Sequence, residues 1–172
     1  MIRLRKIEPT DLPYLYQWEN DAAAWADGSN HNPLSKQDLR TYIENTTGDI
    51  YRDGQLRLMV ESVCEDGECV TAGAVDLFDF DPRNLRAAVG IYIAPDSRGR
   101  GIGEETMRHI EDYAFAFLRL RVLYAVVSLA NRAGMRLFEQ AGFSPLSPLK
   151  RWTLEGDAAM WIKCNRQQNS NP

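Results

Sequence analysis

The sequence predicts an α+β fold: one domain with a central, mixed and mostly antiparallel sheet of about seven strands, flanked by four helices. Strand-like and helix-like patterns are interleaved along the chain, and the strand-like patterns are more numerous. The 172 residues contain no internal repeat and no linker, which fits a single domain. We place this domain at residues 1–164 and expect the polar residues 165–172 to form a disordered tail.

The first half of the chain predicts three strands and two helices. Alternating apolar residues indicate strands at residues 2–7, 56–61 and 70–80. Between the first two strands, Thr10 and Ser35 are candidate N-caps of two helices, the second ending near residue 45. Residues 22–33 separate these helices as a loop or a broken helix.

The second half alternates strands with amphipathic helices. Apolar runs predict strands at residues 86–93 and 121–127, and apolar faces predict helices at residues 104–118 and 131–141. Gly142 stands where a helix C-terminus favours glycine. Residues 149–154 and 158–164 predict a final antiparallel pair.

Composition narrows the class of protein. A formal net charge of −4 argues against a general nucleic-acid binder, which needs a basic face. No apolar stretch approaches transmembrane length, and residues 1–5 lack the core of a signal peptide, so we expect a cytoplasmic protein without a membrane partner. Cys64, Cys69 and Cys164 lack the spacing of a zinc site, so we expect reduced thiols and no metal.

The most informative stretch is the glycine-rich turn at residues 94–103, between a predicted strand and a predicted helix. Glycines let the backbone approach a ligand, and free N–H groups at a helix start favour an anion. Arg98 and Arg100 add permanent positive charge. The turn therefore predicts a phosphate site; an ordinary turn with solvated arginines is the alternative. It matches neither the P-loop pattern nor G-x-G-x-x-G.

Two blocks resemble the GNAT acyltransferase superfamily. Arg98-x-x-Gly101-x-Gly103, after a strand ending in Ala-Pro, is similar to that family's acetyl-CoA pyrophosphate loop. Residues 131–143 resemble its N-x-x-[small]-x-x-L-Y-E-x-x-G-F segment, with Gly134 at the small position.

The resemblance extends beyond these blocks. It is clear over residues 86–143 and weaker from residue 2 to about residue 163. Residues 3–20 are similar to the branch that holds spermidine and ribosomal-protein N-acetyltransferases, and residues 112–124 are most similar to the spermidine enzymes.

The resemblance implies a single GNAT-like domain in which two central parallel strands, here around residues 91–93 and 125–128, splay apart to admit the arm of the cofactor. It implies direct acetyl transfer from acetyl-CoA to a primary amine, with a small cationic amine such as a polyamine as the leading acceptor. A protein N-terminal amine is one alternative, and a catalytically weak module that only binds acetyl-CoA is another. Relatives in the spermidine branch form oligomers, so a homo-oligomer stays an open expectation.

On matching positions, the resemblance assigns the cofactor to a strand, a loop and a helix start. These residues are Ile91, Tyr92, Ile93, Arg98, Gly99, Arg100, Gly101, Ile102, Gly103 and Asn131. Asn131 is also a plain N-cap candidate, and the two roles are compatible. Arg136, about one turn further on, is a further phosphate candidate, with a solvated helix face as the alternative.

The position of the general base departs from the family pattern. Many relatives carry a Glu where this chain has Ala88. An alkyl amine is almost wholly protonated at neutral pH, so a base or a water chain must take its proton. The candidates are Asp76, Asp79 and Glu19, and each has a solvated or ion-paired carboxylate as its alternative.

The position of the general acid also departs from the family pattern. Relatives place a Tyr as general acid where this chain has Phe138, which cannot donate a proton. Tyr92 and Tyr124 are the candidate replacements, although a buried tyrosine commonly serves packing.

An aromatic and acidic wall is the expected acceptor site. The resemblance places Trp18, Glu19 and Trp25 in that wall, and rings with carboxylates suit a cationic amine. The alternative for Trp18 is that it fills the core.

Overall fold

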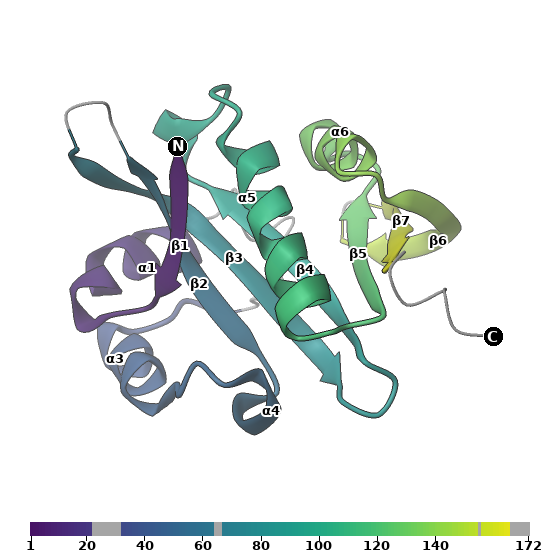
Figure 1. Cartoon of the computed structure of the whole chain (residues 1–172). Helices are drawn as coiled ribbons and strands as arrows, with labels where there is room; N and C mark the ends of the chain where they lie inside the picture. Colours follow the sequence, from purple (N-terminus) through teal and green to yellow (C-terminus); the bar gives the residue numbers. More distant parts are fainter. Residues whose placement is uncertain (22–31, 64–66, 155, 166–172) are drawn as a thin grey trace.

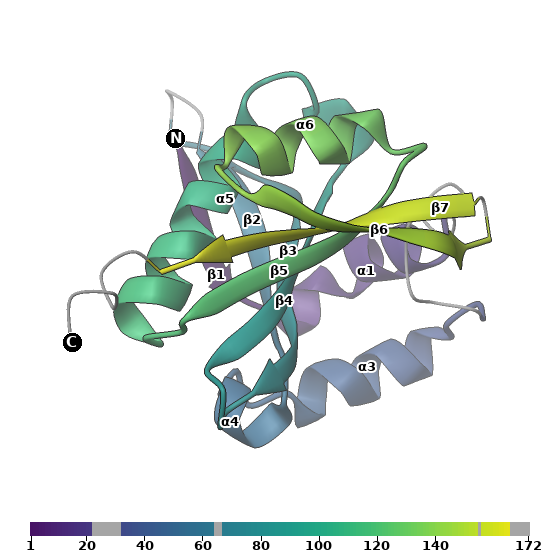
Figure 2. The same ribbon diagram turned by 90° about the vertical axis from the view of Figure 1, so that its right-hand side faces the viewer.

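The computed structural model describes residues 1–21, 32–63, 67–154 and 156–165. Within these residues seven strands form one sheet in the order β1-β2-β3-β4-β5-β7-β6 (Figures 1 and 2), which confirms the predicted α+β class. The strands are β1 (Ile2–Lys6), β2 (Leu56–Val63), β3 (Cys69–Asp81), β4 (Arg86–Ile93), β5 (Val122–Ser128), β6 (Ser144–Thr153) and β7 (Gly156–Cys164). Their neighbours are antiparallel, except that β4 and β5 are parallel.

Helices cover both faces of the sheet. The α-helices are α1 (Leu12–Glu19), α3 (Lys36–Asn45), α4 (Ile50–Asp53), α5 (Ile102–Asp112) and α6 (Arg132–Gln140). Two 3-10 turns, η1 (Pro9–Asp11) and η2 (Pro95–Ser97), and a π-helical turn, η3 (Tyr113–Phe117), complete the helical elements of the described residues. The short helix α4 carries no clear sequence signal.

The helix caps confirm one expectation and correct another. Ser35 caps α3 as predicted: its Oγ accepts from the Asp38 N–H at 3.0 Å, and the Asp38 carboxylate accepts from the Ser35 N–H at 2.9 Å. Thr10 is not an N-cap, because it lies inside η1, whose cap is Glu8. The capping carboxylate there is Asp11, which is buried and fixed by Arg5 at 2.7 Å.

The two faces of the sheet bury different cores. Side chains alternate across a strand, so odd-numbered β4 residues such as Val89 pack toward α5, and Tyr92 packs toward α1 and α3. The larger core joins α5 and α6 to the sheet. The smaller core joins Leu15, Trp18, Leu39 and Ile43 to Met59 and Ala74.

The C-terminal end of the described chain is anchored. The backbone N–H of Asn165 donates to the Arg121 carbonyl at 2.8 Å, and its Nδ2 donates to the carbonyls of Phe115 and Leu120 at 3.1 Å each. Asn165 is buried, so the expected tail does not begin at this residue. Residues 166–172 lie outside the described residues. Cys69 and Cys164 are exposed free thiols, and Cys64 lies outside the described residues.

An ion pair connects β7 with α5, and the same lysine also contacts the end of α6. On β7, Lys163 Nζ donates to Glu111 of α5 at 2.6 Å and to the Ala141 carbonyl after α6 at 2.5 Å. Burial raises the pKa of Glu111, and the charge and hydrogen bond of Lys163 oppose that rise. One ammonium group therefore positions α5 and α6 relative to β7.

We expect Lys163→Met to lower the free energy of unfolding at pH 7 by about 2 kcal/mol, because it leaves the largely buried Glu111 carboxylate without its cation. The cost should shrink as the pH falls toward about 4.5, because burial raises the pKa of Glu111 and the folded variant then takes up a proton there and no longer holds an uncompensated charge. Urea unfolding at pH 7 and pH 5 measures both values. An equal cost at the two pH values would contradict the electrostatic explanation.

Candidate active site

The glycine-rich turn has the geometry of an anion site. Gly99 and Gly101 adopt φ of 73° and 75°, and a Cβ built on either meets no atom within 4 Å. Gly101 is the N-cap of α5, which begins at Ile102 and not at residue 104 as predicted. Among the described residues, the backbone N–H groups from Gly99 to Glu104 have no hydrogen-bond partner. Six adjacent donors at the positive end of a helix favour an anion.

Among the other residues of the turn, the two arginines carry charge, and the remaining two contribute to packing. Arg98 folds back over the turn: its Nε donates to the Ile93 carbonyl at 2.8 Å, and its guanidinium lies 5.9 Å from the centre of the Tyr92 ring. Arg100 is exposed. The Ile102 side chain is buried in the core, so it offers a ligand only its amide. A Cβ on Gly103 would lie 3.5 Å from Leu137, so this glycine lets α5 pack closely on α6.

The central parallel strands splay as predicted. β4 and β5 pair only from Arg86–Val122 to Ala88–Tyr124, and beyond that point no pairing joins them. In Figure 1 the two strands lie together at their lower ends and diverge toward the end that carries the glycine-rich turn. The opening therefore leads from the turn into the middle of the sheet.

The splay leaves a backbone edge unpaired. The Ala94 N–H donates to Ala72 on β3, so alternate β4 residues point their N–H and C=O groups toward β3. Ile91 and Ile93 therefore point theirs away from β3 and into the opening, where the Ile93 carbonyl already accepts from Arg98 Nε. A peptide-like ligand can pair with such an edge.

Asn131 begins α6 on the far side of the opening. Its Oδ1 accepts from the Gly134 N–H at 2.8 Å, so its N-cap role is confirmed. A Cβ on Gly134 would lie 3.0 Å from three side-chain atoms of Asn131, which explains the small residue there. Arg136 is exposed on α6.

An aromatic pair covers the opposite side of the site. Trp18 of α1 is buried, and its ring lies 5.3 Å from that of Tyr92 on β4. Trp18 thus fills the smaller core and also forms part of the wall beside Tyr92. Burial raises the pKa of Tyr92, and the charge of Asp21 raises it further against the opposing effect of Arg98. Tyr92 therefore keeps its hydroxyl proton at neutral pH. Trp25 lies outside the described residues.

Two candidate bases share one arginine. Arg57 of β2 donates to Asp76 on β3 at 2.6 and 3.1 Å and to Glu19 on α1 at 2.5 Å. Burial alone would lower the pKa of Arg57, but the charges of both carboxylates raise it. Both carboxylates already accept hydrogen bonds from the guanidinium, so this geometry suits fixed negative charge for binding better than proton abstraction.

Arg57 is the residue that the sequence interpretation missed. The alternation of residues 56–59 could have indicated it. Leu56 and Leu58 pack toward α5, so Arg57 between them points to the other face of the sheet. Tyr42 of α3 lies beside it, with 5.8 Å between the guanidinium and the ring centre.

The third candidate base occupies a β-bulge. The β3–β4 register shifts between Phe78 and Asp81, and Asp79 adopts φ of 48°. Asp79 accepts a 3.4 Å hydrogen bond from the Tyr124 hydroxyl, and Tyr124 is the β5 partner of Ala88. The bulge therefore brings a carboxylate beside the position where relatives carry a Glu.

Phe138 belongs to the core. It is buried and makes an edge-to-face contact with Phe143 at 5.1 Å. Its ring therefore serves packing, and the roles of Tyr92 and Tyr124 as replacement proton donors stay predictions.

Other kinds of site are not evident in the described part of the chain. No group of three or more His, Cys, Asp and Glu residues there is placed to hold a metal ion. No helix among these residues is long and apolar enough to span a membrane.

Comparison with known families agrees with this geometry. Residues 2–144 match the family model described as an acetyltransferase (GNAT) domain. The spermidine N(1)-acetyltransferase of Escherichia coli K12 is 30% identical over 146 residues, which cover 83% of this chain and 73% of that enzyme. An N-acetyltransferase 9-like protein of Nematostella vectensis is 36% identical over 92 residues, covering 51% of this chain and 46% of that protein.

Solved structures share the fold. A spermidine N-acetyltransferase of Vibrio cholerae, solved with CoA and spermine, matches with a TM-score of 0.84 and 21% identity over 95% of both chains. A dodecameric structure of that enzyme matches with a TM-score of 0.80 and 22% identity, over 99% of this chain and 98% of that one. The chain belongs to the GNAT acetyltransferase family. It is an N-acetyltransferase, which transfers an acetyl group to an amine.

We expect Gly101→Ala to weaken acetyl-CoA binding about tenfold, a loss of ~1.4 kcal/mol, because the new Cβ projects into the open space beside the turn that a phosphate would occupy. Gly54→Ala is the matched control: Gly54 has φ of 71° and equally open surroundings, but it follows α4. Both variants should lose about 1–2 kcal/mol of stability from the positive φ. Calorimetric titration of the folded variants measures the affinities, and equal affinities would refute the phosphate-loop assignment.

Proposed function

We propose that this N-acetyltransferase uses acetyl-CoA to acetylate a small cationic amine of the polyamine class. One observation carries the proposal: the unpaired β4 edge opens beside a wall that combines the Trp18 and Tyr92 rings with the Glu19 and Asp76 carboxylates. The E. coli and V. cholerae relatives are spermidine acetyltransferases, which supports the same acceptor class.

The cofactor site follows from the free donors. The amides from Gly99 to Glu104 would hold the pyrophosphate, with Arg98 and Arg100 adding charge. The backbone groups of Ile91 and the N–H of Ile93 would pair with the pantetheine arm, and Asn131 lies across the opening. The positive φ of Gly99 and Gly101 and the empty space around them fit a bulky phosphate. Bound there, acetyl-CoA supplies the thioester that the amine attacks.

The acceptor wall favours a cation. The carboxylates of Glu19, Asp21 and Asp76 outnumber the guanidinium groups of Arg57 and Arg98, and two aromatic rings lie beside them. Arg57 holds Glu19 and Asp76 in fixed positions, so an entering ammonium group meets preorganised negative charge.

Asp79 is the base that the geometry favours. Unlike Glu19 and Asp76, it has no cationic partner among the described residues. It is exposed, so water reaches it, and it lies next to Tyr124 where β4 and β5 part. It would take the proton of the attacking amine directly or through one water.

Tyr92 is the proton donor that the geometry favours for the leaving thiolate. It lies on the splayed part of β4, and its raised pKa keeps its hydroxyl protonated at neutral pH. A thiol pKa of about 8.5 makes the thiolate a fair leaving group, so modest assistance is enough.

Self-association is consistent with the surface of the last hairpin. Leu146 and Trp152 on β6 are each 61% exposed. The dodecameric V. cholerae relative supports the expectation that this chain forms a homo-oligomer.

The proposal predicts acetylated polyamine when the protein is mixed with acetyl-CoA and spermidine, spermine or putrescine. Mass spectrometry detects the product without interference from the protein's thiols. The rate should rise from pH 7 to pH 9, because the reactive neutral amine becomes more abundant as the pH approaches about 10.4. Preferential acetylation of N-terminal peptides in the same panel would assign the other acceptor class, and no product from any amine would refute the proposal.

Asp79→Asn should lower kcat about 10²-fold with little change in KM, because it removes the proton acceptor and keeps the shape of the bulge. Tyr124→Phe is the matched control, since it removes the hydroxyl and keeps the carboxylate, and its kcat should change less than about threefold. Steady-state kinetics at saturating acetyl-CoA distinguishes them. If both variants lose activity equally, Asp79 has a structural role.

A further inference from the structure

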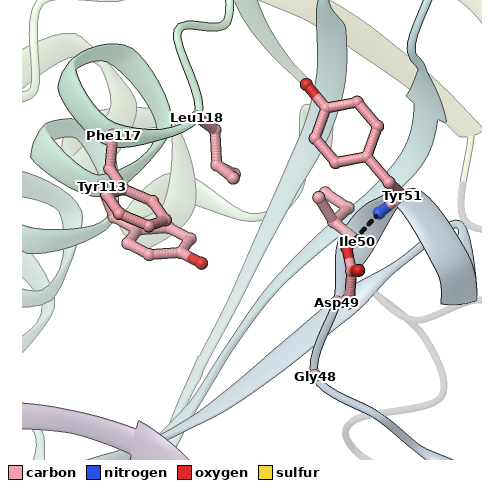
Figure 3. A pocket seen from close by; sticks show the side chains of 7 residues that line it. All are labelled: Gly48, Asp49, Ile50, Tyr51, Tyr113, Phe117 and Leu118. Carbon is pink, nitrogen blue, oxygen red and sulfur yellow. Dashed lines mark hydrogen bonds between the residues drawn. The ribbon is translucent and has the colours of Figure 1, made fainter.

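A second aromatic and acidic site lies outside the acetyl-transfer site. A cavity of about 330 Å³ opens between α4 and the π-helical turn that follows α5 (Figure 3). It lies at the opposite end of α5 from the glycine-rich turn (Figure 1). Its lining residues are Gly48, Asp49, Ile50, Tyr51, Tyr113, Phe117 and Leu118.

Two ring systems face each other across this cavity. Tyr113 and Phe117 stack on one side, with centroids 5.1 Å apart and planes 22° apart. Figure 3 places Tyr51 on the other side, where its ring rests edge-on against Phe80 at 4.9 Å. Tyr51 and Phe117 are 57% and 73% exposed, so large ring faces are presented to the solvent. The stacked pair lies at the two ends of the π-helical turn at residues 113–117, a rare geometry that is frequent at functional sites.

The charge in this cavity is negative. Asp49 is the only charged residue that lines it among the described residues. Burial raises the pKa of Tyr113 and the charge of Asp49 raises it further, so this carboxylate acts on the stacked rings. Lys6 approaches Gly48, but its Nζ donates to the Thr47 carbonyl at 3.1 Å, and Lys6 does not line the cavity. Arg52 is exposed on α4 and also lies outside the lining.

We propose that this cavity binds an organic ammonium ion between the Tyr51 ring and the Tyr113–Phe117 pair, with Asp49 as its counter-ion. Aromatic faces attract a cation through their quadrupoles, and a neighbouring carboxylate adds charge. A neutral ligand of the same shape would gain only the apolar contact. The site is separate from the acceptor site, and it does not depend on which amine is acetylated.

Tetramethylammonium tests the proposal without engaging the transferase chemistry, because it has no N–H group to acetylate. Titration into the ¹⁵N-labelled full chain should give saturable shifts of the amides of Tyr51, Tyr113 and Phe117. tert-Butanol, its neutral isostere, should give none that saturate over the same concentrations.

Two variants separate charge and rings from the fold. Asp49→Asn removes the charge but keeps a residue that can cap α4, and Phe117→Leu replaces an exposed ring by an apolar chain. Each should weaken tetramethylammonium binding about fivefold, the equivalent of ~1 kcal/mol. Acetyltransferase activity should be unchanged in both, since neither residue lies in the acetyl-transfer site.

Three outcomes would overturn the proposal. Equal binding of tert-butanol, or unchanged affinity in Asp49→Asn, would make the cavity a plain apolar pocket. No saturable shift at these residues would leave it without an ammonium ligand. Shifts at the same amides that depend on protein concentration alone would assign the surface to a second copy of the chain.

Discussion

The early end of the pairing between β4 and β5 is the constraint on which the site depends. Two parallel strands that stayed paired would satisfy each other's backbone groups and leave no opening. Pairing stops after Ala88 and Tyr124, so the edge at Ile91 and Ile93 points into a gap. The gap is held open from both sides, because β4 stays paired with β3 along its length and β5 stays paired with β7. The opening therefore belongs to the topology and needs no ligand to form.

Contacts among α5, α6 and β7 fix the position of α5 relative to α6. Gly103 lets α5 approach Leu137 of α6, and Lys163 connects α5, the end of α6 and β7. Because β4 and β5 are parallel, the start of α5 and Asn131 at the start of α6 follow these strands at the same end of the opening. The N-termini of α5 and α6 thus border one opening. The first amides of α5 have no partner among the described residues, and Asn131 caps α6. This arrangement suits a ligand with several phosphates and a long polar arm.

Electrostatics distributes three carboxylates between two roles. Glu19 and Asp76 are immobilised by Arg57 and provide fixed negative charge beside the Trp18 and Tyr92 rings. Asp79 is turned by a bulge toward Tyr124 and is bound by no cation among the described residues. Relatives carry a Glu where this chain has Ala88 on β4. The bulge on the neighbouring strand β3 fits a replacement of that Glu by Asp79. The same reasoning applies to Phe138, which has no hydroxyl to donate a proton. Its ring contributes to the core, whereas Tyr92 lies on the splayed part of β4.

The sequence by itself determined the local features: the strand–turn–helix unit at residues 86–118, the Ser35 and Asn131 caps, and the alternation that sets which β4 side chains face α5. Such features depend on neighbouring residues, whose spacing is visible in the chain. Only the tertiary structure decided which carboxylates are ion-paired, because Arg57, Glu19 and Asp76 come from β2, α1 and β3. It also decided that Asn165 is anchored and that α4 and the π-helical turn border a second cavity. These outcomes depend on contacts between distant residues, and no local pattern records them.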